Sequence, residues 1–313
     1  MSHQDRDFLV EIATLYYREE LSQQEIADRF GVSRATVSNL LRKCREEGIV
    51  EIRIRESPSL AYGLESELKS RFSLEKAIVT HTELDDEHTK ITVGKAAADH
   101  LAATLRDGLK IGISWGTTLY QLVTHLSLAR PPTGTMVAQL IGALGSINPR
   151  FDGFELARSL AEKLHGEYRI IQAPLVVGSL ELKQMLVLEP RIDEALQRAR
   201  SVEVALLGIG SNLPGQSALV RAGFLSPEES SAIHERGAVG VINGLHFDAE
   251  GRFLDCEWND RVVGLSARDL LAIPTTIGVA TGGHKVAAIL GALRGGMLKV
   301  LVTDTATAQA LLS

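Results

Sequence analysis

The segment 22–45, SQQEIADRFGVSRATVSNLLRKCR, constrains the fold of this chain more than any other stretch. Ser22 followed by Glu25 is a capping-box pattern that begins a helix, and Gly31 stands where the chain must turn sharply. Ser33 can begin a second helix by accepting a backbone N–H. Apolar residues recur at helical spacing on both sides of the turn, so each helix has one face for a shared core. The order of these signals predicts a helix-turn-helix.

The second predicted helix carries the residue types that read DNA. Arg and Asn can bond base edges in two places at once, and short hydroxyls and Lys bond phosphate oxygens. From Arg29 to Arg45 there are five basic residues and no acidic one, although residues 1–60 hold nine basic and eleven acidic residues. An ordinary helical hairpin with a solvated charged face would explain this charge run by itself. The agreement of caps, turn and polar face favours DNA reading. The residues expected to contact DNA are Ser33, Arg34, Thr36, Ser38, Asn39, Arg42 and Lys43.

Residues 1–56 are predicted to form a winged helix-turn-helix domain. An upstream helix with Phe8, Ile12 and Leu15 in its apolar stripe would complete the small core. After Gly48, which reads as a helix C-cap, the segment 49–56 alternates apolar and charged residues in near period two. This alternation is typical of a short strand pair, the wing.

The rest of the chain, 57–313, is predicted to be one α/β domain. A helical stripe over 57–74 indicates a linker helix that could pair with its twin in a second copy. Beyond Ala77, β-type runs alternate with amphipathic helices, which predicts a Rossmann-like, mostly parallel sheet covered by helices on both faces. The expected strands are KAIVT, KIGIS, TMVAQLIG, YRIIQAP, VEVALLGIG, AVGVI, TTIGVA and MLKVLVTD.

Composition narrows the class of protein further. No run of the 313 residues approaches the roughly twenty apolar residues of a membrane span, and the N-terminus lacks a signal-peptide pattern, so we expect a cytoplasmic protein without a membrane partner. Cys44 and Cys256 are far apart and offer no metal-ligand spacing, so we expect two reduced cysteines and neither metal nor cofactor. With a net charge of −6, DNA affinity must come from local basic patches on an oligomer.

Ligands of such α/β folds bind outside the carboxyl ends of the strands, and three loops there stand out. The first holds Ser114, Trp115, Gly116, Thr117 and Thr118, where free N–H groups at a helix start and two hydroxyls would cradle a phosphate. Such a turn can also merely connect two elements.

The second loop is the glycine segment 208–212, read as a flexible strand exit whose backbone, at Gly208, Gly210 and Ser211, can approach a ligand. A tight strand-to-loop turn explains this segment equally well. The third, 279–285, includes Gly283 and places Lys285 in the first turn of a helix, where a cation opposes the helix dipole. A bound anion would remove that conflict, and a solvated surface lysine is the alternative.

These residues also carry a family resemblance. LYYREELSQQEIADRFGVSRATVSNLLRKCREEGIVEI resembles the DNA-binding domain of the SorC family of bacterial sugar-catabolism regulators. GISWGTTL, LLGIGS, GAVGVINGLHFDAEG and IPTTIGVATGGHKVAAILGALRGGMLKVLVTD resemble that family's effector domain, in the same order and over nearly the whole chain.

The resemblance implies the fold of sugar-phosphate isomerases and deaminases. It also implies a phosphorylated sugar or sugar-alcohol effector that changes how a homo-oligomer, a dimer or tetramer, binds its operator. Within this chain it implies that 114–118 is the phosphate loop and that Lys285 reaches the effector. Since the linker helix favours a two-fold dimer, the operator should be a pseudo-palindrome.

The chain departs from the family pattern at one position. Val241 stands where the family usually has an acidic residue that can accept hydrogen bonds from sugar hydroxyls. We therefore expect an effector that is less hydroxylated at that end, or one held by Asn243 or His246 instead, and noncovalent binding.

An enzyme is the alternative: a sugar-phosphate isomerase or aminosugar-phosphate deaminase fused to a DNA-binding domain. GIGSNLPG is similar to a deaminase glycine loop, yet it lacks the His and the Asp that would carry out acid/base chemistry. No paired carboxylate or His stands near the predicted phosphate cradle, so we expect no catalytic residue.

Overall fold

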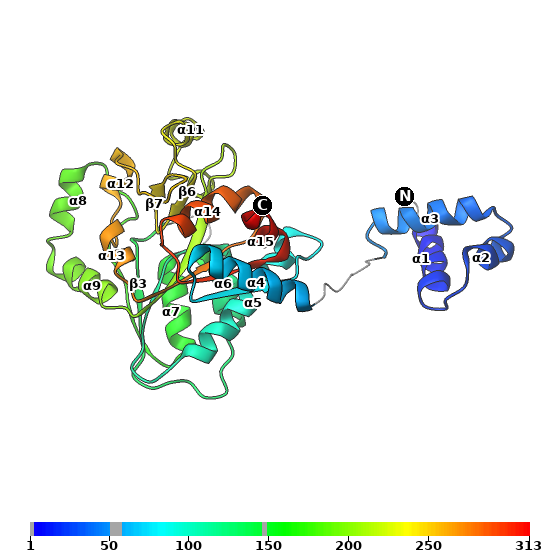
Figure 1. Cartoon of the computed structure of the whole chain (residues 1–313), viewed down its shortest axis with the longest axis horizontal. Coiled ribbons are helices and arrows are strands. Elements are labelled where there is room, and N and C mark those ends of the chain that lie inside the picture. Colours follow the sequence, from blue (N-terminus) through cyan, green and yellow to red (C-terminus); the bar gives the residue numbers. More distant parts are fainter. Residues whose placement is uncertain (1–2, 51–57, 146–148) are drawn as a thin grey trace. The chain divides into compact units, whose positions relative to one another are not determined.

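The computed structural model describes residues 3–50, 58–145 and 149–313. Contacts between residues divide the chain into two compact units, Met1–Arg55 and Glu56–Ser313 (Figure 1). Each unit has its own hydrophobic core. No described helix is long and apolar enough to cross a membrane.

The small unit consists of three helices, α1 (His3–Tyr17), α2 (Gln23–Phe30) and α3 (Arg34–Glu46). Their shared core is apolar and is formed by Ile12, Leu15, Ile26, Ala27, Val37 and Leu41. Cys44 is reduced and buried, and its thiol donates to the Leu9 carbonyl at 3.2 Å. Burial raises the pKa of this thiol, so the cysteine is a packing residue.

Local signals in the sequence fix both helix starts of the turn. Ser22 Oγ accepts from the Glu25 N–H at 3.3 Å, and the Glu25 carboxylate accepts from the Ser22 N–H at 2.8 Å, which completes the capping box. Gly31 has φ 65° and ends α2, a conformation that favours glycine. Ser33 caps α3 by accepting from the Thr36 N–H at 3.0 Å. The predicted wing falls mostly on 51–57, outside the described residues.

The large unit is built on a sheet whose order is β1-β9-β8-β5-β2-β3-β4, with every neighbouring pair parallel. These strands are β1 (Lys76–Thr80), β2 (Lys110–Ile113), β3 (Met136–Gln139), β4 (Glu167–Arg169), β5 (Val204–Ser211), β8 (Thr275–Val279) and β9 (Val300–Asp304). The predicted parallel sheet is therefore confirmed, although the YRIIQAP strand is shorter than expected. The residues after Arg169 are outside the regular strand, and Pro174 forms only an isolated parallel bridge with Ala143.

Helices cover both faces of this sheet (Figure 1). The side chains of β5 alternate, so Val204 and Leu206 join one apolar cluster and Ala205 and Leu207 join the other. The long helices are α4 (Pro58–Phe72), α5 (Asp86–Thr104), α6 (Thr117–His125), α7 (Gly153–Lys163), α9 (Pro190–Arg200), α11 (Pro227–Glu235), α14 (Val286–Arg294) and α15 (Thr305–Leu312). Shorter helices are η1 (Pro149–Phe151), α8 (Leu180–Leu186), α10 (Ala218–Arg221), α12 (Glu257–Arg261), α13 (Ala267–Leu271) and η2 (Gly283–Lys285).

A short antiparallel hairpin extends the sheet beyond β5. β6 (Gly240–Ile242) pairs with the last residues of β5, and β7 (Leu245–Phe247) pairs with β6. The sequence did not indicate β7. The prediction of a flexible strand exit at 208–212 was wrong, because β5 continues through Ser211 and Gly210 pairs with Val241. Glycine serves here for close packing rather than for a turn, since a Cβ on Gly210 would lie 2.6 Å from Val241 Cγ1.

The helix expected over 57–74 is α4, which packs against β1 and α15 of its own unit. Leu64 is 8% exposed and Leu68 is fully buried. Most of the apolar face that we expected to pair with a second copy is therefore buried within its own unit. Leu60 and Tyr62 stay exposed at 39% and 75%. Helical spacing gives an apolar face but does not say which partner covers it.

Candidate functional site

A cavity of about 300 Å³ opens at the carboxyl ends of the parallel strands. Its wall is formed by the loop after β2 with the start of α6, the end of β5, the segment around α10, the β6–β7 hairpin, and residues near β3 and η1. The lining residues are Trp115, Gly116, Thr117, Thr118, Leu119, Leu144, Phe151, Gly208, Ile209, Gly210, Ser211, Gln216, Ala218, Arg221, Ala222, Val241, Asn243, Gly244, Val279 and Lys285.

The start of α6 faces this cavity without a side-chain cap. Gly116 occupies the cap position with φ 132° and offers no side-chain acceptor to the first N–H groups of the helix. Thr118 is 3% exposed and Thr117 is partly buried, so two hydroxyls stand beside that helix end. Gly208 lets the loop approach, because a Cβ there would lie 2.9 Å from the Trp115 carbonyl oxygen. Free N–H groups, hydroxyls and a helix dipole together favour an anion.

Lys285 is a cation on the lining of the same cavity. It lies in the short turn η2, directly before α14 rather than within it, and it is partly buried. Its pKa is lowered to about 8, first by burial and then by the positive charges of Lys90 and Arg221, against the opposing effect of Asp86. In the described part of the chain, no carboxylate forms an ion pair with Lys285.

Arg221 is a second cation on the lining. It ends α10, is exposed, and donates to the Gln216 carbonyl at 3.1 Å. Neither Arg221 nor Gln216 stood out in the sequence. A four-residue helix has no periodicity from which a side chain's direction could be predicted.

Asn243 supplies the cavity with an unpaired acceptor. This residue is 2% exposed and has φ 48°, a left-handed conformation that Asn tolerates. Its Nδ2 donates to the Leu140 carbonyl at 3.2 Å, which fixes the orientation of the amide. Its Oδ1 is buried and has no hydrogen-bond partner. A buried acceptor without a partner is costly, and a ligand hydroxyl would satisfy it.

A carboxylate at the end of β9 holds the loops around Lys285. Asp304 is 1% exposed and accepts from the hydroxyls of Thr82 at 2.7 Å, Thr307 at 2.6 Å and Thr281. Burial raises the pKa of Asp304, but the hydrogen bonds outweigh burial, so the pKa lies below its usual value. Two contacts connect this carboxylate to the turn that holds Lys285. One is the Thr281 hydroxyl, and the other is the N–H of Gly282, which donates to Thr307 Oγ1 at 3.0 Å.

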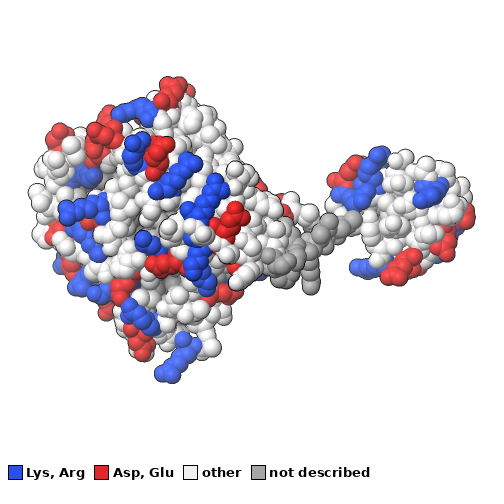
Figure 2. Space-filling model, viewed as in Figure 1, with Lys and Arg blue, Asp and Glu red and all other residues white. Residues whose placement is uncertain are grey.

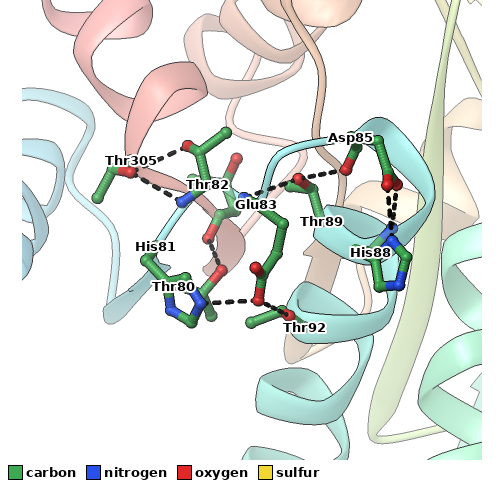
Figure 3. A network of polar contacts seen from close by, with 10 residues as sticks. Thr80, His81, Thr82, Glu83, Asp85, His88, Thr89, Thr92 and Thr305 are labelled. Carbon is green, nitrogen blue, oxygen red and sulfur yellow. Dashed lines mark hydrogen bonds and ion pairs between the residues drawn. The ribbon is translucent and has the colours of Figure 1, made fainter. Parts of the chain in front are cut away.

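The loop between β1 and α5 is held by a second group of polar contacts (Figure 3). Thr82 bonds Thr305, Glu83 accepts from Thr92 Oγ1 at 3.0 Å, and Asp85 caps α5 by accepting from the His88 N–H at 2.8 Å. These contacts fix the first turns of α5, which carry Asp86 and Lys90. The charges that act on Lys285 are therefore held in place.

Most of the residues predicted for effector binding line this one cavity: Trp115, Gly116, Thr117, Thr118, Gly208, Gly210, Ser211, Asn243 and Lys285. Ser114 and Gly283 do not. Ser114 is buried at 1% exposure in the strand exit, and Gly283 is exposed on the outer side of its turn. His246, considered as an alternative to Asn243, is fully buried and also does not line the cavity.

The small unit presents its polar helix face to solvent. All seven residues predicted to contact DNA are exposed: Ser33, Arg34, Thr36, Ser38, Asn39, Arg42 and Lys43. Arg42 donates to Asn39 Oδ1 at 3.0 Å and lies 3.8 Å from Glu46, contacts between exposed groups that are easily exchanged. Figure 2 shows basic and acidic side chains interspersed on the visible face, so neither charge dominates that face. No cluster of metal-ligating residues occurs among the residues described.

Family comparisons match both units. Residues 58–313 match the family described as "Putative sugar-binding domain", and residues 7–60 match the Crp-like helix-turn-helix domain. The deoxyribonucleoside regulator of Bacillus subtilis (strain 168) is 31% identical over 315 residues, which cover 100% of this chain and 99% of that protein. The sorbitol operon regulator of Klebsiella pneumoniae is 30% identical over 310 residues and 98% of each chain.

Solved structures agree with these matches. The full-length sorbitol operon regulator SorC from Klebsiella pneumoniae has a TM-score of 0.77 and 28% identity, and the match covers 100% of both chains. A DeoR family transcriptional regulator from Listeria monocytogenes has a TM-score of 0.73 and 27% identity over 80% of this chain and 99% of that one.

Proposed function

This chain belongs to the SorC family of sugar-binding transcriptional regulators with a helix-turn-helix domain, and we propose that a phosphorylated sugar or sugar alcohol in the cavity of its larger unit controls a carbohydrate catabolic operon. The regulator acts in the cytoplasm, where it binds operator DNA through α3. The effector shifts the equilibrium between operator-binding states of the protein.

One observation carries the choice of a phosphorylated effector. Two cations, Lys285 and Arg221, line the cavity, and no carboxylate stands among the described lining residues. The lowered pKa of Lys285 is consistent with this excess of positive charge, because burial and like charges disfavour the protonated form of the side chain. A phosphate dianion at the uncapped start of α6 would balance both cations and use the Thr117 and Thr118 hydroxyls.

The DNA partner follows from the exposed face of α3. A chain with net charge −6 and one basic helix offers few phosphate contacts by itself. Two or more copies would multiply those contacts. We therefore propose a homo-oligomer on a pseudo-palindromic operator, in which half-sites reflect the symmetry of the protein.

The enzyme alternative is less favoured by the cavity itself. Its described lining contains no Asp, Glu or His that could act as a general acid or base at neutral pH. Lys285 is suited to hold an anion. We propose ligand binding without turnover, and assays on pentose and aminosugar phosphates check this directly.

A thermal-shift screen of sugar and polyol phosphates against the corresponding free compounds tests the proposal. A ligand at one hundred times its dissociation constant stabilises the folded protein by about 2.7 kcal/mol. The stabilisation should require the phosphate and disappear in Lys285→Ala. Lys299→Ala is the matched control, because Lys299 directly precedes β9 at the amino ends of the parallel strands, whereas the cavity lies at their carboxyl ends. Stabilisation by free sugars alone, or an unchanged response in Lys285→Ala, would contradict the proposal.

A further inference from the structure

The cavity distributes its hydrogen-bonding groups unevenly. Lys285, Arg221 and the start of α6 provide cations and donors, and Asn243 provides a buried acceptor. Other parts of the lining, Leu144, Phe151 and Val241, offer only apolar surface. A ligand that fills this cavity therefore meets one part of the wall that cannot bond a hydroxyl.

Val241 forms the centre of a row across three antiparallel strands. It stands opposite Gly210 in the β5–β6 ladder and opposite His246 in the β6–β7 ladder. Side chains at directly opposite positions share one face of the sheet. A Cβ on Gly210 would lie 2.6 Å from Val241 Cγ1, so the isopropyl group covers the space that this glycine leaves. Val241 is 4% exposed and lines the cavity, so this row presents methyl groups to the ligand.

His246 does not supply the missing polar group. It is fully buried, neither ring nitrogen has a hydrogen-bond partner, and it does not line the cavity. Burial lowers the pKa of the imidazole to about 4, so the ring is uncharged at neutral pH. A ligand hydroxyl pressed against this row would lose its water and gain no bond in return.

On the basis of the proposed function, we infer that the effector is a deoxygenated sugar phosphate, in which the carbon facing Val241 carries no hydroxyl. Asn243 Oδ1 then accepts from a hydroxyl elsewhere on the same ligand. The class includes 2-deoxypentose 5-phosphates and 6-deoxyhexulose 1-phosphates, in which the deoxygenated carbon lies away from the phosphate. Val241 thereby determines specificity, because an apolar wall penalises the hydroxylated analogue.

Calorimetric titration with two matched pairs tests this inference. The pairs are 2-deoxyribose 5-phosphate with ribose 5-phosphate, and 6-deoxy-L-fructose 1-phosphate with L-fructose 1-phosphate. In at least one pair the deoxy compound should bind about tenfold to a hundredfold more tightly, the range that a hydrophobic pocket achieves against an added hydroxyl. Equal or tighter binding of the hydroxylated member in both pairs overturns the inference and leaves the proposed function intact.

Variants at position 241 show whether that side chain is responsible. Val241→Thr keeps the shape and adds a hydroxyl, so the preference for the deoxy compound should shrink. Val241→Asp should reverse it, and the new carboxylate can pair with His246 across the hairpin. Val239→Thr, on a residue that does not line the cavity, is the control and should keep the preference. If Val241→Asp does not fold, Val241→Thr decides, and an unchanged preference there overturns the inference.

Failure of the inference and failure of the proposed function give different results. If none of the four phosphates binds, the inference is wrong, and the wider thermal-shift screen decides separately whether any phosphorylated sugar or polyol is bound. If only free sugars bind, the proposed function fails as well.

Discussion

At the scale of single residues, we expect effector binding to depend most on the charge of Lys285. Its pKa of about 8 lies below the ordinary value of 10.5, first because of burial and then because of Lys90 and Arg221. A phosphate needs the protonated ammonium group. Effector affinity should therefore be full between about pH 7 and about pH 8, where the phosphate is a dianion and the ammonium group is protonated, and fall as the pH rises further. Titrations from about pH 7 to about pH 10 measure this.

The same group makes an opposite prediction for the stability of the effector-free protein. Between about pH 8 and pH 10.5 the folded state holds fewer protons on Lys285 than the unfolded state does. The free energy of unfolding should therefore rise with pH across this window, and that contribution should be absent in Lys285→Ala. Denaturant unfolding of both proteins at several pH values gives the difference. Identical pH dependences would show that Lys285 is not held in this environment.

At the scale of elements, we propose that α3 determines DNA recognition. Replacing Arg34 or Arg42 by Ala should weaken operator binding, because both side chains are exposed on its polar face. A lost base contact costs about 1 to 3 kcal/mol and relaxes specificity at one position, whereas a lost phosphate contact weakens all sequences alike and flattens the salt dependence. Gel-shift titrations distinguish the two. Arg191→Ala, with a side chain 89% exposed on the other unit, is the control and should bind operator normally.

The elements also show what the sequence could predict. The structure contains the helix starts at Ser22 and Ser33 and all eight expected strands. These features could be predicted because they depend on residues that are close together in the sequence. The continuation of β5 through its glycines depends on pairing with β6, whose residues come about thirty positions later, and no local pattern records that contact. The position of Arg221 on the cavity wall follows from tertiary packing alone.

The stripe on α4 shows the same limit. Its spacing correctly predicts a helix with one apolar face, but β1 and α15 of the same unit cover Leu64 and Leu68. The apolar residues of α4 would need the same helical spacing whether the helix packed against a second copy or against the sheet of its own chain. The sequence therefore predicts the surfaces that must be buried better than it predicts what buries them.

At the scale of the whole molecule, we propose that one chain couples two binding events in two units. Coupling between two ligands is reciprocal by thermodynamic necessity. If a sugar phosphate changes operator affinity by some factor, then operator DNA must change sugar-phosphate affinity by the same factor. Lys285→Ala should lose the response to effector and still bind operator, because the exposed face of α3 belongs to the other unit.

The most direct test is calorimetric titration of the sugar phosphate that stabilises the protein most, carried out with and without saturating operator DNA. We predict two different dissociation constants whose ratio equals the change in operator affinity that the same ligand causes in a gel-shift titration. Identical dissociation constants in the presence and absence of operator would contradict the claim that this cavity controls DNA binding.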